Sequence, residues 1–124
     1  MATVHGYYLS KIRYDKNFQK RVDKYLNRES WSIHEWINYQ DEKLEILLEE
    51  SRKHVPFYRN YWSHKKDSFL KLENWPIISK KTIMENPLSF IDDRYSDVRL
   101  YKDHTSGTTG TPLDIYLDYE SVRE

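Results

Sequence analysis

The stretch His104-Thr105-Ser106-Gly107-Thr108-Thr109-Gly110-Thr111-Pro112 lies between two short segments in which apolar and polar residues alternate. Val98 and Leu100 precede it, and Leu113, Ile115 and Leu117 follow it at every second position. Alternation with a period of two is typical of β-strands, and a Gly-containing loop between two such segments is typical of a hairpin. We therefore expect strands at 98–103 and 113–117, joined by this loop.

The composition of the loop suits a phosphate chain. Gly107 and Gly110 allow the backbone to approach an anion closely, so that successive N–H groups can converge on it. Five hydroxyl side chains add hydrogen-bond donors. The predicted cofactor-binding residues are Thr105, Ser106, Gly107, Thr108, Thr109, Gly110 and Thr111. On composition alone, a polar hairpin loop without a ligand is an equal alternative. A Walker A loop and a Rossmann fingerprint are excluded, because their residue order is not present.

Helices are predicted upstream of the hairpin. Residues 10–29 carry a narrow apolar stripe at helical spacing, which predicts a surface helix. Ser32 and Glu35 form a capping-box pattern ahead of a helix over about residues 33–53. Pro56 should end that helix near His54, because the residue before a proline is disfavoured in the helical conformation.

Shorter elements should follow. Residues 55–62 are dense in aromatic side chains and are expected to pack as a core-facing turn and a short helix. Ser79 is expected to cap a short helix that runs through Glu85 and ends before Pro87. Residues 119–124 have the composition of the start of a further helix. The predicted class is α+β, with N-terminal helices followed by a β-hairpin that carries the phosphate-binding loop.

Composition excludes several classes of protein. The 124 residues contain 20 Lys and Arg against 20 Asp and Glu, so no net charge favours a nucleic-acid partner. Cys is absent, which excludes disulfides, a thiol nucleophile and Cys-ligated metals. We expect no signal peptide and no membrane span, and therefore a cytoplasmic location. The chain has 19 aromatic residues although its mean hydropathy is −0.93, which indicates that these rings pack against other residues.

The order of residues in the loop carries a resemblance. Thr-Ser-Gly-Thr-Thr-Gly-x-Pro at 105–112 resembles the phosphate-binding signature of the adenylate-forming superfamily, which includes acyl-CoA synthetases. Three upstream blocks, at 52–59, 75–80 and 86–90, are similar in order and spacing to the opening of phenylacetate-CoA ligases, coenzyme F390 synthetases and CapK-like proteins. Superfamily members usually carry Lys where this chain has Leu113, and Lys102 is the substitute that the sequence offers.

The resemblance implies an ATP-dependent ligase that activates a carboxylic acid as an acyl-adenylate, assisted by Mg²⁺. Many members of the family then transfer the acyl group to a thiol such as coenzyme A. Phenylacetate-like acids, aryl acids and a carboxylate of capsular polysaccharide biosynthesis are all candidate substrates. Residues 105–111 would hold the β- and γ-phosphates of ATP. Residues 1–29 would be an N-terminal helical extension, and residues 30–124 the start of the AMP-binding N-terminal domain, whose parent fold is α/β.

In that family the adenine site, the acid pocket and the catalytic Lys follow this region, beyond Glu124. We therefore expect the 124-residue chain to be a truncated piece that is inactive by itself, with the C-terminal part of the same protein as its missing partner. No catalytic or metal-ligating residue is assigned within it. The oligomeric state and the acyl acceptor stay open.

Two other functions are alternatives. A helical protein-interaction module would use the aromatic surface of residues 57–62, with the Gly/Thr loop as a spacer. A nucleic-acid surface would use Lys65-Lys66 and Lys80-Lys81 with Trp62 and Trp75, although the neutral net charge disfavours it.

Isolated polar residues add little. His34-Glu35 begins a zinc-protease pattern, but Asn38 replaces its second ligand. His54 is expected to cap or pack, and His104 beside Ser106 is not surrounded by a nucleophile elbow. The remaining acidic pairs are interpreted as solvated carboxylates: Asp92-Asp93 and Glu49-Glu50.

Overall fold

The computed structural model describes residues 3–95, 100–105 and 110–123. Its α-helices are α1 (Val4–Arg13), α2 (Phe18–Leu26), α3 (Ile33–His54), α4 (Pro56–Trp62), α5 (Lys80–Glu85) and α6 (Tyr119–Arg123). Short 3₁₀ helices are η1 (Asn27–Ser30), η2 (Leu72–Asn74), η3 (Pro87–Phe90) and η4 (Asp93–Tyr95). The strands are β1 (Tyr101–His104) and β2 (Asp114–Leu117). The α+β prediction, helices followed by a hairpin, is confirmed at this level.

The long helix α3 has the predicted ends. The Ser32 backbone N–H donates to the Glu35 carboxylate at 2.7 Å, and the Glu35 N–H donates to the Ser32 hydroxyl at 3.3 Å, so both bonds of the capping box are present. At the other end Val55 is extended, and Pro56 begins α4. The predicted short helices at 56–62 and 80–85 are also confirmed, the second with its Ser79 cap.

The single helix predicted over residues 10–29 is wrong. The chain forms α1 and α2 instead, with a break at residues 14–17. The Asp15 carboxylate accepts hydrogen bonds from the Asn17 N–H at 3.0 Å and from Arg21 at 2.8 Å. A short acidic side chain that bonds to the backbone two residues later stabilises a turn in competition with the helix.

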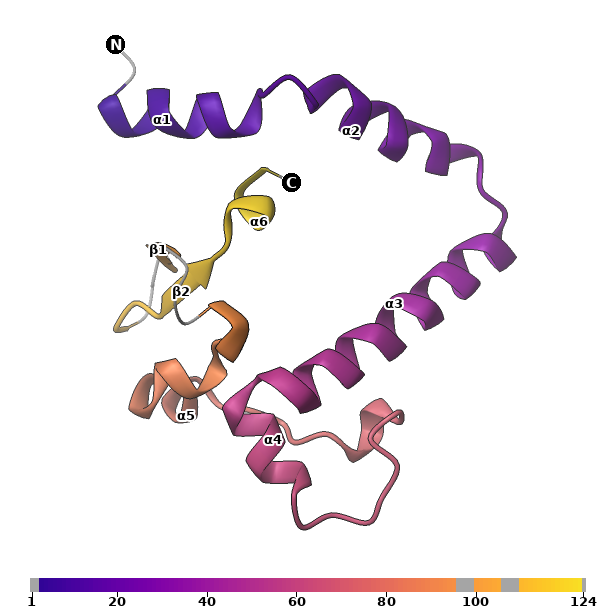
Figure 1. Cartoon of the computed structure of the whole chain (residues 1–124), viewed down its shortest axis with the longest axis vertical. Helices are drawn as coiled ribbons and strands as arrows, with labels where there is room; N and C mark the ends of the chain where they lie inside the picture. Colours follow the sequence, from indigo (N-terminus) through magenta and orange to yellow (C-terminus); the bar gives the residue numbers. More distant parts are fainter. Residues whose placement is uncertain (1–2, 96–99, 106–109, 124) are drawn as a thin grey trace.

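The elements form an open arrangement (Figure 1). α1 and α2 cross one side, α3 leads away from them to α4, and the hairpin with α6 returns towards α1. α6 contacts α1, and the Tyr8 and Tyr119 hydroxyl oxygens lie 3.2 Å apart. The two ends of the described chain therefore meet.

Little of the chain is buried. Within the described residues the buried apolar side chains are Leu48 of α3, Trp62 of α4 and Val122 of α6. The accessible surface is 10044 Å², whereas a compact monomer of this mass would expose about 7,100 Å². The fold consequently leaves a large apolar surface in contact with solvent. No helix in the described ranges is long and apolar enough to cross a bilayer.

Candidate phosphate-binding site

The hairpin presents the predicted loop at its closed end. β1 and β2 pair antiparallel, with Tyr101 opposite Leu117 and His104 opposite Asp114. Beyond the last pair, the Thr105 N–H donates to the Leu113 carbonyl at 2.9 Å, and the Leu113 N–H donates to the Thr105 hydroxyl at 3.0 Å. These two bonds hold the base of the loop. The hydroxyl acts as an acceptor here, which leaves its own proton available for a ligand.

Three of the seven predicted site residues are described: Thr105, Gly110 and Thr111. Gly110 is exposed, and a Cβ placed on it would meet no atom within 4 Å. The backbone at this point is therefore open to a ligand. The other four predicted residues, Ser106, Gly107, Thr108 and Thr109, lie outside the described residues.

Lys80 lies beside the loop. Its ammonium group donates to the Thr111 carbonyl at 2.5 Å. Lys80 is the first residue of α5, whose start is fixed by the Ser79 hydroxyl accepting from the Thr82 N–H at 3.1 Å. Lys80, Lys81, Gly110 and Thr111 share one open depression of about 520 Å³. The structure thus brings the ammonium group of Lys80, from another element, to the described end of the loop, whereas the Lys81 side chain extends into solvent near Glu85.

Lys102, which the sequence offered as the loop cation, has a different partner. Its ammonium group lies 2.8 Å from the Asp114 carboxylate on the neighbouring strand. This hydrogen bond and charge raise the pKa of Lys102. Lys102 therefore stabilises the hairpin, whereas Lys80 takes the position next to the loop backbone.

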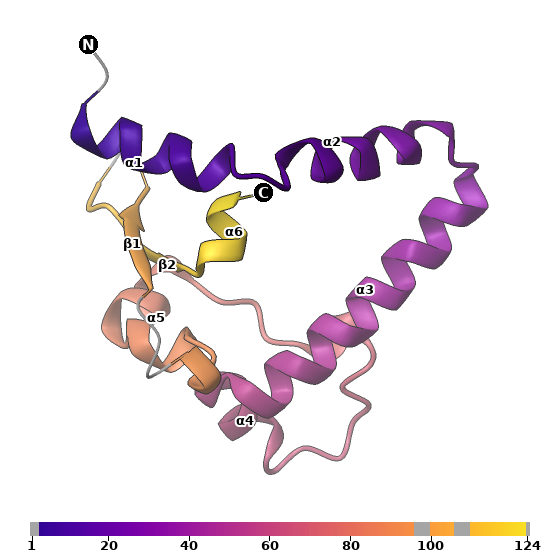
Figure 2. The same cartoon turned by 45° about the horizontal axis from the view of Figure 1, so that its top comes forward.

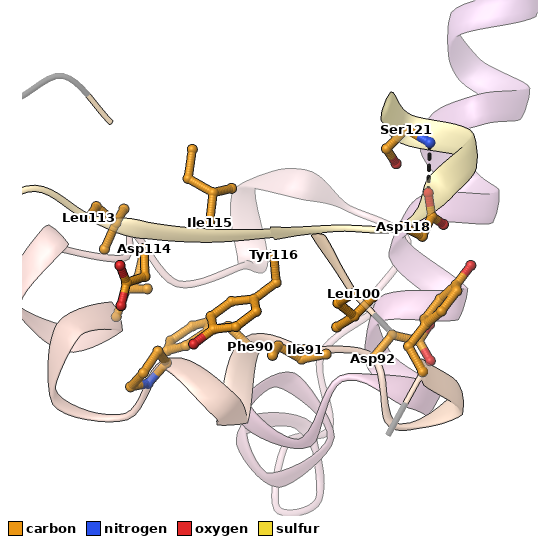
Figure 3. A pocket seen from close by; sticks show the side chains of 13 residues that line it. Phe90, Ile91, Asp92, Leu100, Leu113, Asp114, Ile115, Tyr116, Asp118 and Ser121 are labelled. Carbon is orange, nitrogen blue, oxygen red and sulfur yellow. Dashed lines mark hydrogen bonds between the residues drawn. The ribbon is translucent and has the colours of Figure 1, made fainter. Parts of the chain in front are cut away.

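An apolar cleft lies under the hairpin (Figure 3). It encloses about 350 Å³ between β2 and η3, with Phe90, Ile91 and Tyr116 among the residues that line it. At one end the Asp118 carboxylate accepts from the Ser121 N–H at 2.7 Å, and it also accepts from the Tyr95 hydroxyl, which raises the pKa of Tyr95. β2 lines this predominantly apolar cleft, and its first residue, Asp114, lies close to the candidate phosphate-binding loop.

A second polar cluster joins α3 and α4 to η4. His54 Nδ1 lies 3.5 Å from Asp93, and Arg59 binds the same carboxylate at 2.5 Å. Arg94 bridges Asp92 and Glu50, at 2.5 Å to each. His54, Asp92 and Asp93 offer ligand atoms within 4.8 Å of one another. Because two guanidinium groups neutralise these carboxylates, the cluster acts as an ion-pair network that fastens η4 to the helices.

This network predicts a dependence of stability on pH. The hydrogen bond from Arg94 holds the pKa of Asp92 below its usual range, and the bond from Arg59 does the same for Asp93. Such carboxylates stabilise the fold above the usual Asp pKa of about 4, and this stabilisation is lost as the pH falls through and below that value. We expect the urea midpoint to fall below about pH 4, and to fall less in D92N/D93N, although the effect is modest because both groups lie near the surface, with side chains 19% and 39% exposed.

The matched control for this pH series is D67N, which removes an exposed carboxylate in the loop after α4. It should follow the wild-type curve. Equal acid slopes in wild type and D92N/D93N would contradict a role of the network in stability.

Other predicted residues have structural partners. Glu35 is used in the capping box of α3. Trp62 is only 7% exposed, and the Trp75 indole donates to the Phe69 carbonyl at 2.7 Å, so both rings have partners within the chain. Phe57 stacks on Phe90 with ring centroids 4.3 Å apart, which confirms that the aromatic segment packs into the chain. His104 is exposed, and its relation to Ser106 lies outside the described residues.

Comparison with protein-family models, curated proteins and solved structures found no match. Sequence reasoning identified the loop, but it did not connect Lys80 with it. The two lie 31 residues apart, and no local pattern links them.

Proposed function

We propose that this chain carries the triphosphate-binding loop of an ATP-dependent, carboxylate-activating ligase of the phenylacetate-CoA ligase and CapK-like family. The observation that carries the proposal is the Thr-Ser-Gly-Thr-Thr-Gly-x-Pro order at 105–112 in a loop between two antiparallel strands. The hydrogen bonds between Thr105 and Leu113 support it, because they fix the two ends of the loop.

The position of Lys80 gives further support. A loop that binds a triphosphate benefits from a cation that can compensate the charge of the leaving pyrophosphate. Leu113 cannot supply it, whereas the Lys80 ammonium group already touches the Thr111 carbonyl. In the bound state the ammonium group would move from this carbonyl to a phosphate oxygen nearby.

The proposed chemistry is attack of a carboxylate oxygen on the α-phosphorus of ATP, which forms an acyl-adenylate and releases pyrophosphate. Mg²⁺ and the loop would hold the β- and γ-phosphates in line, by positioning and electrostatics and without covalent participation. Coenzyme A is the proposed acyl acceptor. Parts of the parent enzyme beyond Glu124 would bind the acid and the adenine and would supply the catalytic Lys.

The test is carboxylate-dependent exchange of labelled pyrophosphate into ATP. The assay should use the protein encoded by the complete open reading frame that contains residues 1–124, with a panel of aryl and alkyl acids. We expect exchange with at least one acid, loss of exchange in Lys80→Ala, and no exchange by the 124-residue chain alone. Acid-dependent exchange by the 124-residue chain would refute the proposal that the acid and adenine sites lie beyond Glu124. No exchange by the complete product would refute the ligase assignment and favour the interaction-module alternative.

A further inference from the structure

We infer that His104 is a second cationic contact for the phosphate chain, and that it makes phosphate binding at this hairpin depend on pH near neutrality. This inference rests on the proposed function, because it concerns the same ligand. It is argued from three described residues on three elements: His104 at the end of β1, Thr111 before β2, and Lys80 at the start of α5.

The hairpin fixes the position of His104 at the base of the loop. His104 is the last residue of β1 and lies opposite Asp114 in the strand register. The next residue, Thr105, exchanges two hydrogen bonds with Leu113. Because the strand pairing and these two bonds hold the backbone on both sides of it, the His104 side chain projects from a defined point beside the loop.

His104 and Lys80 both lie next to Thr111. The hairpin and α5 are on the same side of the molecule (Figure 2). His104 and Thr111 line one open depression of about 480 Å³, and Lys80 and Thr111 line another of about 520 Å³ that shares Met84 with the first. A phosphate group bound beside Thr111 would therefore have the ammonium group of Lys80 and the imidazole of His104 within the same continuous trough.

The imidazole is accessible and has a neighbour that can orient it. The His104 side chain is 69% exposed, and its Nδ1 lies 3.9 Å from the Asp103 carboxylate. The same carboxylate accepts from the His104 backbone N–H at 2.8 Å, which keeps it on the Nδ1 side of the ring. The partner of one ring nitrogen determines which nitrogen serves another ligand. Nε2 is thus the proposed donor to phosphate.

The other charged groups of the trough and of the adjoining strands form pairs. Lys102 of β1 lies 2.8 Å from Asp114 of β2. Lys81 lies 3.8 Å from Glu85, one helical turn along α5. The Asp114 carboxylate, which faces His104 across the hairpin, is therefore already compensated by a lysine.

The two remaining donors differ in their response to pH. A lysine keeps its proton throughout the neutral range, whereas an imidazole ordinarily gains its proton near pH 6.5. Lys80 would attract phosphate at every pH from 5.5 to 7.5. His104 would add a charge-assisted hydrogen bond only at the acidic end of this range.

The experiment is a titration of the ¹⁵N-labelled 124-residue chain with inorganic tripolyphosphate at pH 5.5 and pH 7.5, followed at the amides of Gly110 and Thr111. Tripolyphosphate itself gains protons as the pH falls, so the measured quantity is the ratio of the two dissociation constants, compared between the wild type and H104Q. We expect acidification to favour the wild type over H104Q by about fivefold, for a charged donor that tightens binding tenfold. At pH 7.5 the two proteins should agree within about twofold.

The matched control is H64Q, which removes an exposed imidazole just after α4 and should keep the wild-type ratio. Circular dichroism checks that each variant is folded at both pH values. Equal ratios in the wild type and H104Q, with saturable binding at both pH values, would overturn the inference and leave the proposed function standing. An equal change in H64Q and H104Q would also overturn it. If Gly110 and Thr111 respond to tripolyphosphate at neither pH, the proposed function fails and the inference fails with it.

Discussion

Trp62→Ala is expected to lower the free energy of unfolding by about 3–5 kcal/mol, the range for removal of a large buried aromatic side chain. Trp62 is one of the few buried apolar side chains in the described structure, and its ring meets Tyr61 and Trp75 at centroid distances of 5.3 and 5.5 Å. Because the described core is small, we expect loss of cooperative unfolding in the half formed by α3 and α4. Urea unfolding followed by circular dichroism measures the change.

Trp62→Phe tests whether Trp62 stabilises the fold through ring packing. The Trp62 indole N–H has no hydrogen-bond partner among the described residues. Replacement by a phenyl ring therefore removes no hydrogen bond, and the variant should retain most of the wild-type stability. A loss in Trp62→Phe as large as that in Trp62→Ala would contradict a packing role. So would a Trp62→Ala variant with the wild-type midpoint.

Lys80→Ala is expected to weaken binding of Mg·ATP by about tenfold to a hundredfold. A hydrogen bond from a charged donor contributes about 1.5–3 kcal/mol, which corresponds to this range in the dissociation constant. Lys81→Ala is the matched control, because Lys81 adjoins Lys80 but extends into solvent, 3.8 Å from Glu85, with its side chain 86% exposed. Titration monitored by backbone amide NMR measures both variants.

Lys81→Ala should weaken ATP binding only slightly, through loss of a nearby solvated charge. If Lys80→Ala and Lys81→Ala weaken binding equally, the phosphate is attracted by the overall positive charge of the two lysines and not by a specific contact with Lys80. If neither has an effect, the loop takes no cation from α5.

Local sequence patterns predicted much of this fold. The capping box of Ser32 and Glu35, and Pro56 at the other end, define α3 through contacts within a few residues. The hairpin was predicted from apolar residues at every second position from Leu113 to Leu117. The strands form there, but burial on β2 does not alternate, since Asp114 and Ile115 are exposed and Tyr116 and Leu117 are half-buried. The elements themselves lie where the local patterns place them, because the interactions that determine them are short in sequence.

Features that depend on side-chain competition or on distant contacts were not predictable in the same way. The break between α1 and α2 depends on the hydrogen bond that the Asp15 side chain accepts from the Asn17 backbone N–H. The apolar periodicity of residues 10–29 contains no information about this bond. The contact of Lys80 with Thr111, and that of Arg94 with Glu50, join residues 31 and 44 positions apart. Such pairs are set by tertiary packing, for which the sequence offered no local signal.

The most direct test of the central claim, that residues 105–111 bind the phosphates of ATP, is a titration of the ¹⁵N-labelled chain with Mg·ATP. The account predicts weak, saturable amide shifts that are largest at Thr105, Gly110, Thr111 and Lys80, and that inorganic tripolyphosphate reproduces. Saturable shifts located elsewhere, or a folded chain whose loop amides do not respond to either ligand, would contradict it.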